Sequence, residues 1–261
     1  MLRTLNIAAS GMAAQQTNLD SVSNNIANAN TTGYKKQRME FQDLLYQTVR
    51  APGTATSANT QSPGGLQVGN GVRIVGSNRM FEQGTLQTTG NQLDVAIEGR
   101  GFLVVQRPDG TLGYTRAGTL QTDGEGRLVT PEGAPLDPAI TIPPDSTGVS
   151  VSADGKVMVT IPGQQAPVEI GQLTVATFIN PGGLQALGHN LYTATAASGD
   201  AQVGAPGSDG RGTLLQGALE QSNVNVVEEM IGLISAQRAY ELNSKVITAA
   251  DEMLRAATQL K

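Results

Sequence analysis

The chain has 261 residues, of which only 15% are charged and 3% aromatic, and its net charge is −5. An acidic balance without clustered Lys and Arg argues against nucleic-acid binding, and the absence of Cys excludes both a disulfide framework and a cysteine zinc site. No segment approaches the roughly 20 apolar residues of a membrane span, so no membrane insertion is expected.

The first predicted element is a helix within residues 1–34, whose apolar residues recur every seven positions. The stripe and its neighbouring seam include Leu5, Met12, Leu19, Val22 and Ile26. A seven-residue repeat holds one side of a helix against a partner in a coiled coil. Arg3 and Asp20 are the only charges in this helix, although a surface helix normally presents a charged face to water. We therefore expect neighbouring molecules to pack against it, and burial within its own domain is the alternative.

The same segment does not have the form of a cleaved secretory signal. Gln15 and Gln16 stand where an unbroken apolar run would be required. We therefore expect that any export uses a route without a cleaved peptide. The helix should stop at residues 28–33, because Asn and Gly tolerate the left-handed conformation that ends helices.

A connecting segment is predicted at residues 35–80, with a long loop at about 50–65. Inside the loop no side chain is larger than Gln, and Pro52, Gly53, Pro63 and Gly64 interrupt it near its two ends. Such a composition cannot bury enough apolar surface to fold alone. We expect a long loop or linker, for which a solvated surface loop is the default, and a partner surface is needed if the loop is to be ordered.

Residues 81–219 are predicted to form a central β domain. Short apolar or alternating runs are separated by tight-turn signals, of which Asp109-Gly110, Asp123-Gly124 and Asp154-Gly155 are the clearest. Asp-Gly supplies the positive φ angles that tight hairpin turns need. Several short strands at this spacing favour an antiparallel sandwich or an irregular barrel.

A C-terminal helix is predicted within residues 220–261, with Asn225 as its N-cap. Its seven-residue stripe consists of Val226, Leu233, Tyr240, Ile247 and Leu254. Glu241 with Lys245 and Asp251 with Arg255 are spaced for ion pairs one turn apart. We expect a charged, solvated face opposite the stripe. The predicted fold class is α+β, with two long terminal helices that pair in a coiled-coil-like layer around a central antiparallel β domain.

Catalytic and cofactor chemistry is not expected. The one histidine, His189, lies in a turn without a Cys or Ser partner. Asp94 and Glu98 would lie about 13 Å apart along a strand, which exceeds the separation that a glycosidase carboxylate pair requires. The Asp-Gly turns lack the alternating acidic residues of a calcium loop. The sequence therefore predicts neither an enzyme nor a metal or cofactor site.

Two motifs resemble a known family. Residues 23–35 resemble the N-terminal signature of bacterial flagellar rod and hook proteins, and residues 229–241 resemble the matching C-terminal signature. The signature positions of the first motif are Asn25, Ala27, Asn28, Asn30, Thr31, Gly33 and Tyr34. Residues 46–53 and 65–72, which flank the long loop, resemble the distal rod branch of this family.

The resemblance implies a helical homopolymer that forms a rigid tube, transmits torque from motor to hook and encloses the export channel. It implies a rod of the flagellar basal body that crosses the periplasm, with subunits exported through the flagellar type III apparatus. Terminal helices would form the innermost layer, and the loop would fill gaps between subunits. Implied partners are further copies, proximal rod proteins, hook or hook-adjacent subunits, surrounding ring (bushing) proteins, the rod cap and the export apparatus. Neither nucleic acid nor a cofactor is implied.

Two alternatives stay open from the sequence. A proximal rod or hook subunit belongs to the same class of assembly protein. A secreted β-rich carbohydrate-active enzyme belongs to a different class, and it would need a convergent pair of acids that the sequence does not offer.

Overall fold

The computed structural model describes residues 2–53, 55–57, 60–61, 63–164 and 166–259. They fall into two compact units. The helical unit comprises Met1–Ala27, Gln37–Asn78 and Asn225–Lys261, and the β body comprises Asn28–Lys36 and Arg79–Val224. The domain limits predicted from the sequence (34/35, 80/81 and 219/220) differ from these divisions and stay a prediction.

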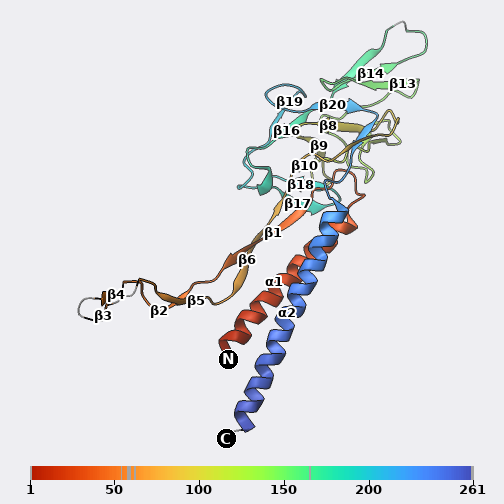
Figure 1. Cartoon of the computed structure of the whole chain (residues 1–261). Coiled ribbons are helices and arrows are strands. Elements are labelled where there is room, and N and C mark those ends of the chain that lie inside the picture. Colours follow the sequence, from red (N-terminus) through yellow and green to blue (C-terminus); the bar gives the residue numbers. More distant parts are fainter. Residues whose placement is uncertain (1, 54, 58–59, 62, 165, 260–261) are drawn as a thin grey trace. The chain divides into compact units, whose positions relative to one another are not determined.

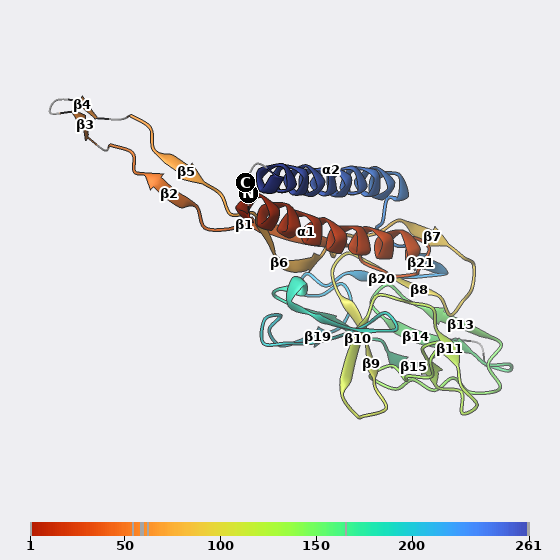
Figure 2. The same cartoon turned by 90° about the horizontal axis from the view of Figure 1, so that it is seen from below.

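The helical unit contains α1 (Leu2–Ala27), β1 (Gln37–Asp43), β2 (Gln47–Arg50), β3 (Ala55–Ser57), β4 (Thr60–Gln61), β5 (Leu66–Val68), most of β6 (Val72–Arg79) and α2 (Val226–Gln259). The two helices lie side by side in both views (Figures 1 and 2). At the start of α2, the Asn225 side-chain oxygen accepts a hydrogen bond from the Val227 N–H at 3.1 Å, as the predicted N-cap requires.

The segment predicted as a long loop forms a paired ribbon in its described part. β2 pairs with β5, and β3 pairs with β4, both antiparallel. We call the hairpin Gln47–Val68 the arm (Figure 2). Inside the predicted loop at about 50–65, the described residues form only the short pair β3–β4, because β2 and β5 lie at its two borders. The long loop stays a prediction. Residues 54, 58, 59 and 62 of the predicted loop lie outside the described residues.

The β body contains β7 (Leu86–Thr88), β8 (Val95–Glu98), β9 (Phe102–Gln106), β10 (Leu112–Thr115), β11 (Gln121–Thr122), β12 (Leu128–Val129), β13 (Gly148–Val151), β14 (Lys156–Thr160), β15 (Val168–Gln172), β16 (Val175–Thr177), the 3₁₀ turn η1 (Pro181–Gly183), β17 (Gln185–Gly188), β18 (Leu191–Thr193), β19 (Gln202–Gly204), β20 (Thr213–Gln216) and β21 (Ala218–Glu220). The predicted hairpin turns at Asp109-Gly110 and Asp154-Gly155 join β9 to β10 and β13 to β14, and both glycines have positive φ.

A six-stranded sheet has the order β17-β18-β10-β9-β16-β19. Its central strands β9, β10 and β16 are mostly buried, whereas the edge strands β17 and β19 are largely exposed. Along β9, Leu103 and Val105 point into one apolar cluster, whereas Phe102 and Val104 point into another. This alternation follows from the two-residue period of a strand. The β body therefore closes two cores of its own.

The coarse fold class is confirmed: a helix at each end of the chain and an antiparallel β region between them. Every described strand pair whose register is known is antiparallel. None of the described sheets closes on itself, so the irregular barrel is not found among these strands. The sandwich arrangement stays a prediction.

A buried ion triad joins three distant parts of the β body. The Lys35 ammonium lies 2.5 Å from one oxygen of Glu220, and the Arg116 guanidinium lies 3.1 Å from the other. All three side chains are at most 4% exposed. Burial lowers the pKa of Lys35 and of Arg116, and the Glu220 carboxylate opposes both shifts.

Backbone carbonyl groups complete the triad, because two cations share a single carboxylate. Lys35 donates to the Glu82 carbonyl at 2.6 Å, and Arg116 donates to the Gly99 carbonyl at 2.6 Å. Charge-assisted hydrogen bonds of this kind stabilise cations that have been taken out of water. The backbone reinforces the link, since the Gly33 N–H donates to the Glu220 carbonyl at 2.8 Å.

Breaking the triad should destabilise the chain far more than replacing it. We expect Glu220→Gln to lower the free energy of unfolding by about 3–5 kcal/mol, because it leaves two buried cations without a counter-charge. The combined variant Lys35→Met, Arg116→Met, Glu220→Leu should cost less. Urea unfolding of the full chain measures both, with the exposed partner Glu169→Gln as the control that should change little. A triple variant less stable than Glu220→Gln would show that packing, rather than charge, dominates.

Gly33 should be irreplaceable for a steric reason. Its φ is +69°, and a Cβ there would lie 2.6 Å from the Ala117 nitrogen. Gly90 is the matched control, because its φ is +74° and a Cβ would meet nothing within 4 Å. We expect Gly90→Ala to cost about 1–2 kcal/mol from backbone strain alone, and Gly33→Ala to cost clearly more in urea unfolding. Equal costs would contradict the close packing at Gly33.

Candidate assembly surface

The predicted stripe of α1 stays partly open in the single chain. Leu5, Met12, Leu19, Val22 and Ile26 are all half-buried. The α1 side chains that the chain does bury are small or polar, namely Ala8, Ala14, Ser21 and Asn25. The helix therefore packs its small and its polar side chains against the rest of the chain, and its large apolar side chains are only partly covered.

The stripe of α2 behaves in the same way. Leu233, Ile247 and Leu254 are half-buried, and Val226 and Tyr240 are exposed. The fully buried positions of this helix are Ala236 and Ala250. Whether the ten stripe residues of the two helices form subunit contacts stays a prediction.

The two helices contact each other through small and polar residues and run antiparallel. Asn25 near the end of α1 donates to the Glu229 carboxylate near the start of α2, at 3.1 Å. Further back in α1, a Cβ on Gly11 would lie 3.0 Å from the Asn243 side chain. Close approach of two helices requires small residues at such points, because larger side chains would hold the helices apart.

The seven-residue repeat did not predict a second apolar face on α2. Its side opposite the stripe was expected to be charged, but Val227, Ile231, Ile234 and Leu242 are 66%, 63%, 47% and 62% exposed. Residues 227, 231 and 234 share one helical face because they are spaced by four and three. That side of the helix is therefore mixed rather than only charged, because the exposed Arg238 lies four residues after Ile234 on the same face. The available signal was an apolar pattern on both sides of the helix, which is typical of a helix covered all round.

The predicted ion pairs of α2 have different outcomes. Asp251 and Arg255 form theirs at 2.9 Å. Glu241 and Lys245 are not paired with each other among the described salt bridges. Charged residues are therefore spread along both halves of α2, and the i,i+4 ion pair is formed only near its C-terminal end among the described salt bridges.

The signature residues are structural anchors in both units. In the helical unit, the Asn25 amide donates to the Gln37 carbonyl at 2.8 Å and accepts from the Gln37 N–H at 2.9 Å, as a strand neighbour would. In the β body, Gly33 and Tyr34 are buried beside the ion triad. The remaining positions lie at the helix end and in its turn, with Ala27 and Asn30 exposed and Asn28 and Thr31 half-buried.

The arm exposes apolar side chains in its vicinity and along its strands. Leu45, immediately before it, is 89% exposed, and Val49 and Leu66 on its two strands are 60% and 52% exposed. The predicted rigidity residues Pro52, Gly53, Pro63 and Gly64 are exposed as well. Such side chains normally mark a surface that another molecule covers.

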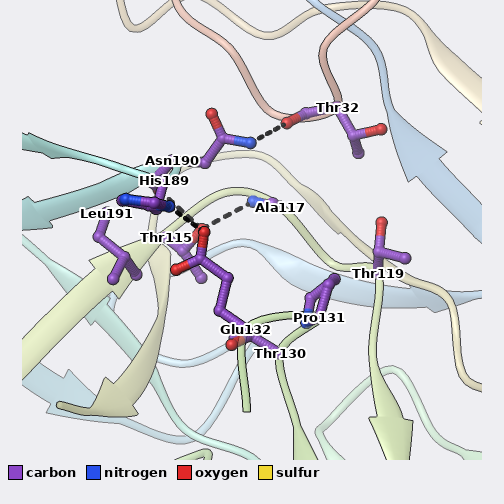
Figure 3. Close-up of a pocket in the computed structure, with 10 residues that line it drawn as sticks. All are labelled: Thr32, Thr115, Ala117, Thr119, Thr130, Pro131, Glu132, His189, Asn190 and Leu191. Carbon is purple, nitrogen blue, oxygen red and sulfur yellow. Dashed lines mark hydrogen bonds and ion pairs between the residues drawn. The ribbon is translucent and has the colours of Figure 1, made fainter. Parts of the chain in front are cut away.

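The one histidine lines a pocket of about 260 Å³ without a nucleophile (Figure 3). The His189 imidazole contacts the Glu132 carboxylate, and the Asn190 amide donates to the Thr32 carbonyl at 3.3 Å. His189 and Asn190 both have positive φ, which the turn between β17 and β18 requires. Threonine hydroxyl groups supply much of the remaining lining. This geometry explains a tight turn better than a catalytic base.

Asp94 and Glu98, which the sequence analysis rejected as a glycosidase acid pair, have different surroundings. The Asp94 carboxylate is buried and accepts hydrogen bonds from Thr89 at 2.6 Å and Asn91 at 3.1 Å, whereas Glu98 is exposed. Across the described part of the chain, no three His, Cys, Asp or Glu side chains gather as metal ligands would. None of the described helices is long and apolar enough to span a bilayer.

Three family models match the chain. Residues 5–35 match a model described as flagella basal body rod protein, and residues 96–159 match the flagellar hook protein FlgE/F/G D1 domain. Residues 215–260 match the C-terminal model of the flagellar basal body rod FlgEFG proteins. The first and last matches cover the two predicted signatures, and the second lies within the β body.

Individual proteins are similar over the full length. The flagellar basal-body rod protein FlgG of Caulobacter vibrioides is 50% identical over 261 residues, which is 100% of both chains. Its namesake in Borreliella burgdorferi is 49% identical over 263 residues, covering 100% of this chain and 99% of that one. The flagellar hook-basal body complex protein FlhP of Bacillus subtilis is 31% identical over 265 residues, covering 97% of each.

Proposed function

Since this chain belongs to the flagellar basal-body rod protein family, we propose that it is the structural subunit of the distal rod. It is a structural protein of the flagellar basal body rather than an enzyme. In the proposed role, copies assemble into a rigid helical tube that transmits torque from motor to hook and encloses the export channel.

The observation that carries this proposal is the contrast between the two units. The β body closes two apolar cores on its own. By contrast, α2 leaves apolar side chains exposed on the side opposite its stripe, and both stripes are incompletely covered. Exposed apolar surface of this extent favours association, because its removal from water lowers the free energy.

The finer assembly follows from the seven-residue repeats. We infer that the stripes of α1 and α2 form coiled-coil-like seams with neighbouring copies, and that the second face of α2 contacts a further copy. A helix with apolar residues on two opposite sides can join two neighbours at once. This arrangement supports a closed layer of helices rather than a simple dimer.

The proposed partners extend beyond further copies. Membership of the family supports assembly with other rod and hook components. We propose contacts with proximal rod proteins, hook or hook-adjacent subunits, the surrounding ring proteins, the rod cap and the export apparatus. We also propose that the rod crosses the periplasm and that export uses no cleaved signal peptide.

A proximal rod or hook subunit is the alternative within the family. The sequence identity to two proteins named FlgG is 50% and 49% over the full length, whereas the identity to the FlhP relative is 31%. This difference favours a distal rod subunit. The exposed arm supports a mechanical role as well. We propose that it bridges neighbouring subunits and limits their sliding, which a tube wall must permit if the tube is to bend.

A carboxylate on the open side of either helix should block assembly without unfolding the β body. We expect Leu19→Asp, Leu233→Asp, Ile247→Asp and Ile231→Asp to abolish filaments, because each buries an unpaired charge once copies meet. Thr248→Asp is the matched control, because Thr248 is exposed on α2 and its neighbours one turn away, Lys245 and Glu252, are charged. Electron microscopy of concentrated protein measures assembly, and circular dichroism measures the β signal. Normal filaments from all four variants would contradict the proposed seams.

Shortening the arm should soften the filaments rather than prevent them. Deleting residues 54–62, some of which lie outside the described residues, leaves the β2–β5 pair and both helices in place. We expect curved or more flexible filaments with a shorter persistence length in electron micrographs. A length-matched Gly-Ser replacement separates the effect of length from that of sequence. Equal stiffness in the deletion variant and the unmodified chain would remove the mechanical role of the arm.

A further inference from the structure

A groove in the β body has the lining of a docking site. It has a volume of about 660 Å³, and it lies between the start of β9 and the turn that follows β16. Phe81, Phe102 and Phe178 line it, together with Ile179 and Arg116. The volume lies within the range of pockets that enclose a ligand group or a side chain of a partner.

The concentration of aromatic rings here is unusual for this chain. Only four Phe occur in the whole sequence, and three of them line this groove. Phe81 and Phe178 each pack edge-to-face on Phe102, with ring centres 5.4 and 5.8 Å apart. At the rim, Ile179 is 81% exposed, so the apolar lining continues onto the surface.

The groove also holds a hydrogen-bond donor that the chain does not satisfy. The Arg116 side chain is 4% exposed and forms an ion pair with Glu220. Its guanidinium lies 5.6 Å from the centre of the Phe102 ring. Its Nε–H finds no acceptor among the described residues. A buried donor without a partner is costly, and a carbonyl or carboxylate oxygen from an incoming segment would relieve that cost.

The apolar side chain that fits this groove is carried by the chain itself. Among the described residues, Leu45 at 89% and Ile179 at 81% are the two most exposed large apolar side chains. Leu45 precedes the arm, and the exposed acid Asp43 lies two residues before it. The groove lining holds the exposed cation Arg100 together with two acids, Glu82 and Asp209, and Asp209 is paired with Arg211 at 2.9 Å. Arg100 has no ion pair among the described salt bridges, so an acid beside an apolar anchor meets an uncompensated cation beside an apolar groove.

We propose that this groove receives Leu45 of a second copy, with the Asp43 carboxylate of that copy against Arg100. The inference rests on the assembly of copies proposed above and names one contact within it. Each chain has one groove and one Leu45 segment, which belong to different units. A reciprocal exchange between two copies would close into a two-fold dimer, whereas a contact passed from each copy to the next continues into a ring or an open helix. The proposed contact is of the second, head-to-tail kind, as a tubular polymer requires.

The absence of Cys makes the contact directly testable. Full-length Leu45→Cys and Ile179→Cys are mixed, allowed to assemble, sedimented and oxidised, and the products are separated on a non-reducing gel. Mixing two single-Cys variants ensures that the heterodimer joins different copies. The matched control pairs Leu45→Cys with Leu112→Cys, since Leu112 is exposed on the β body outside the groove lining. Circular dichroism checks that every variant keeps its β signal.

The expected result is a cross-linked heterodimer from the 45/179 pair and its loss in the 45/112 pair. Peptide mapping by mass spectrometry should place the disulfide between the two introduced positions. Sedimented filaments without the 45/179 product, or with equal product from both pairs, would overturn the contact and leave the assembly proposal intact. Failure of the unmodified chain to sediment at all would overturn the assembly proposal, and the contact would fall with it.

Discussion

The ion triad of Lys35, Arg116 and Glu220 is the constraint on which the architecture depends. It joins the segment that leaves α1 to the strand that precedes α2, although 185 residues separate Lys35 from Glu220 in the chain. The Gly33–Glu220 backbone bond and the Lys36–Asn223 bond at 2.8 Å reinforce the same junction. The β body therefore holds the exit of one terminal helix and the entry of the other at a single place.

The two units differ in how completely they bury their apolar side chains. In the β body, the alternation of β9 sends apolar side chains into a core on each face of its sheet, so this unit satisfies its own burial. In the helical unit, small and polar residues make the internal contacts, and larger apolar residues remain outside. Only Arg3 and Asp20 are charged in α1, whereas eight of the 34 residues of α2 are charged, so the two helices differ in how much charge they present to water.

The local features of the fold could be predicted, because their causes are local. The stop after Ala27, the cap at Asn225 and the hairpins at Gly110 and Gly155 follow from the conformations that Asn and Gly tolerate. The aliphatic stripes follow from helical spacing in the same way. Each of these signals lies within a few residues of the element that it controls.

Long-range features could not be predicted from one sequence. Nothing near Lys35 indicates that its partner is Glu220, and nothing near Arg116 indicates a buried cation. The pairing of β2 with β5 could not be predicted, because the two strands are short and the segment that separates them in the sequence has no apolar pattern. The second apolar face of α2 could not be predicted from the seven-residue repeat, because Val227 and Ile231 lie outside the positions of that repeat.

The long span of the triad also sets an order of events in time. A chain that emerges end first from a narrow conduit can form its hairpins early, because their contacts are local. The junction must wait until both residue 35 and residue 220 are free, and by then most of the chain has passed. Until that moment Glu220 and its cations stay hydrated, and the β body lacks its closing link. Under the export proposed above, the location of this ion triad would delay final folding until most of the chain has passed through the conduit.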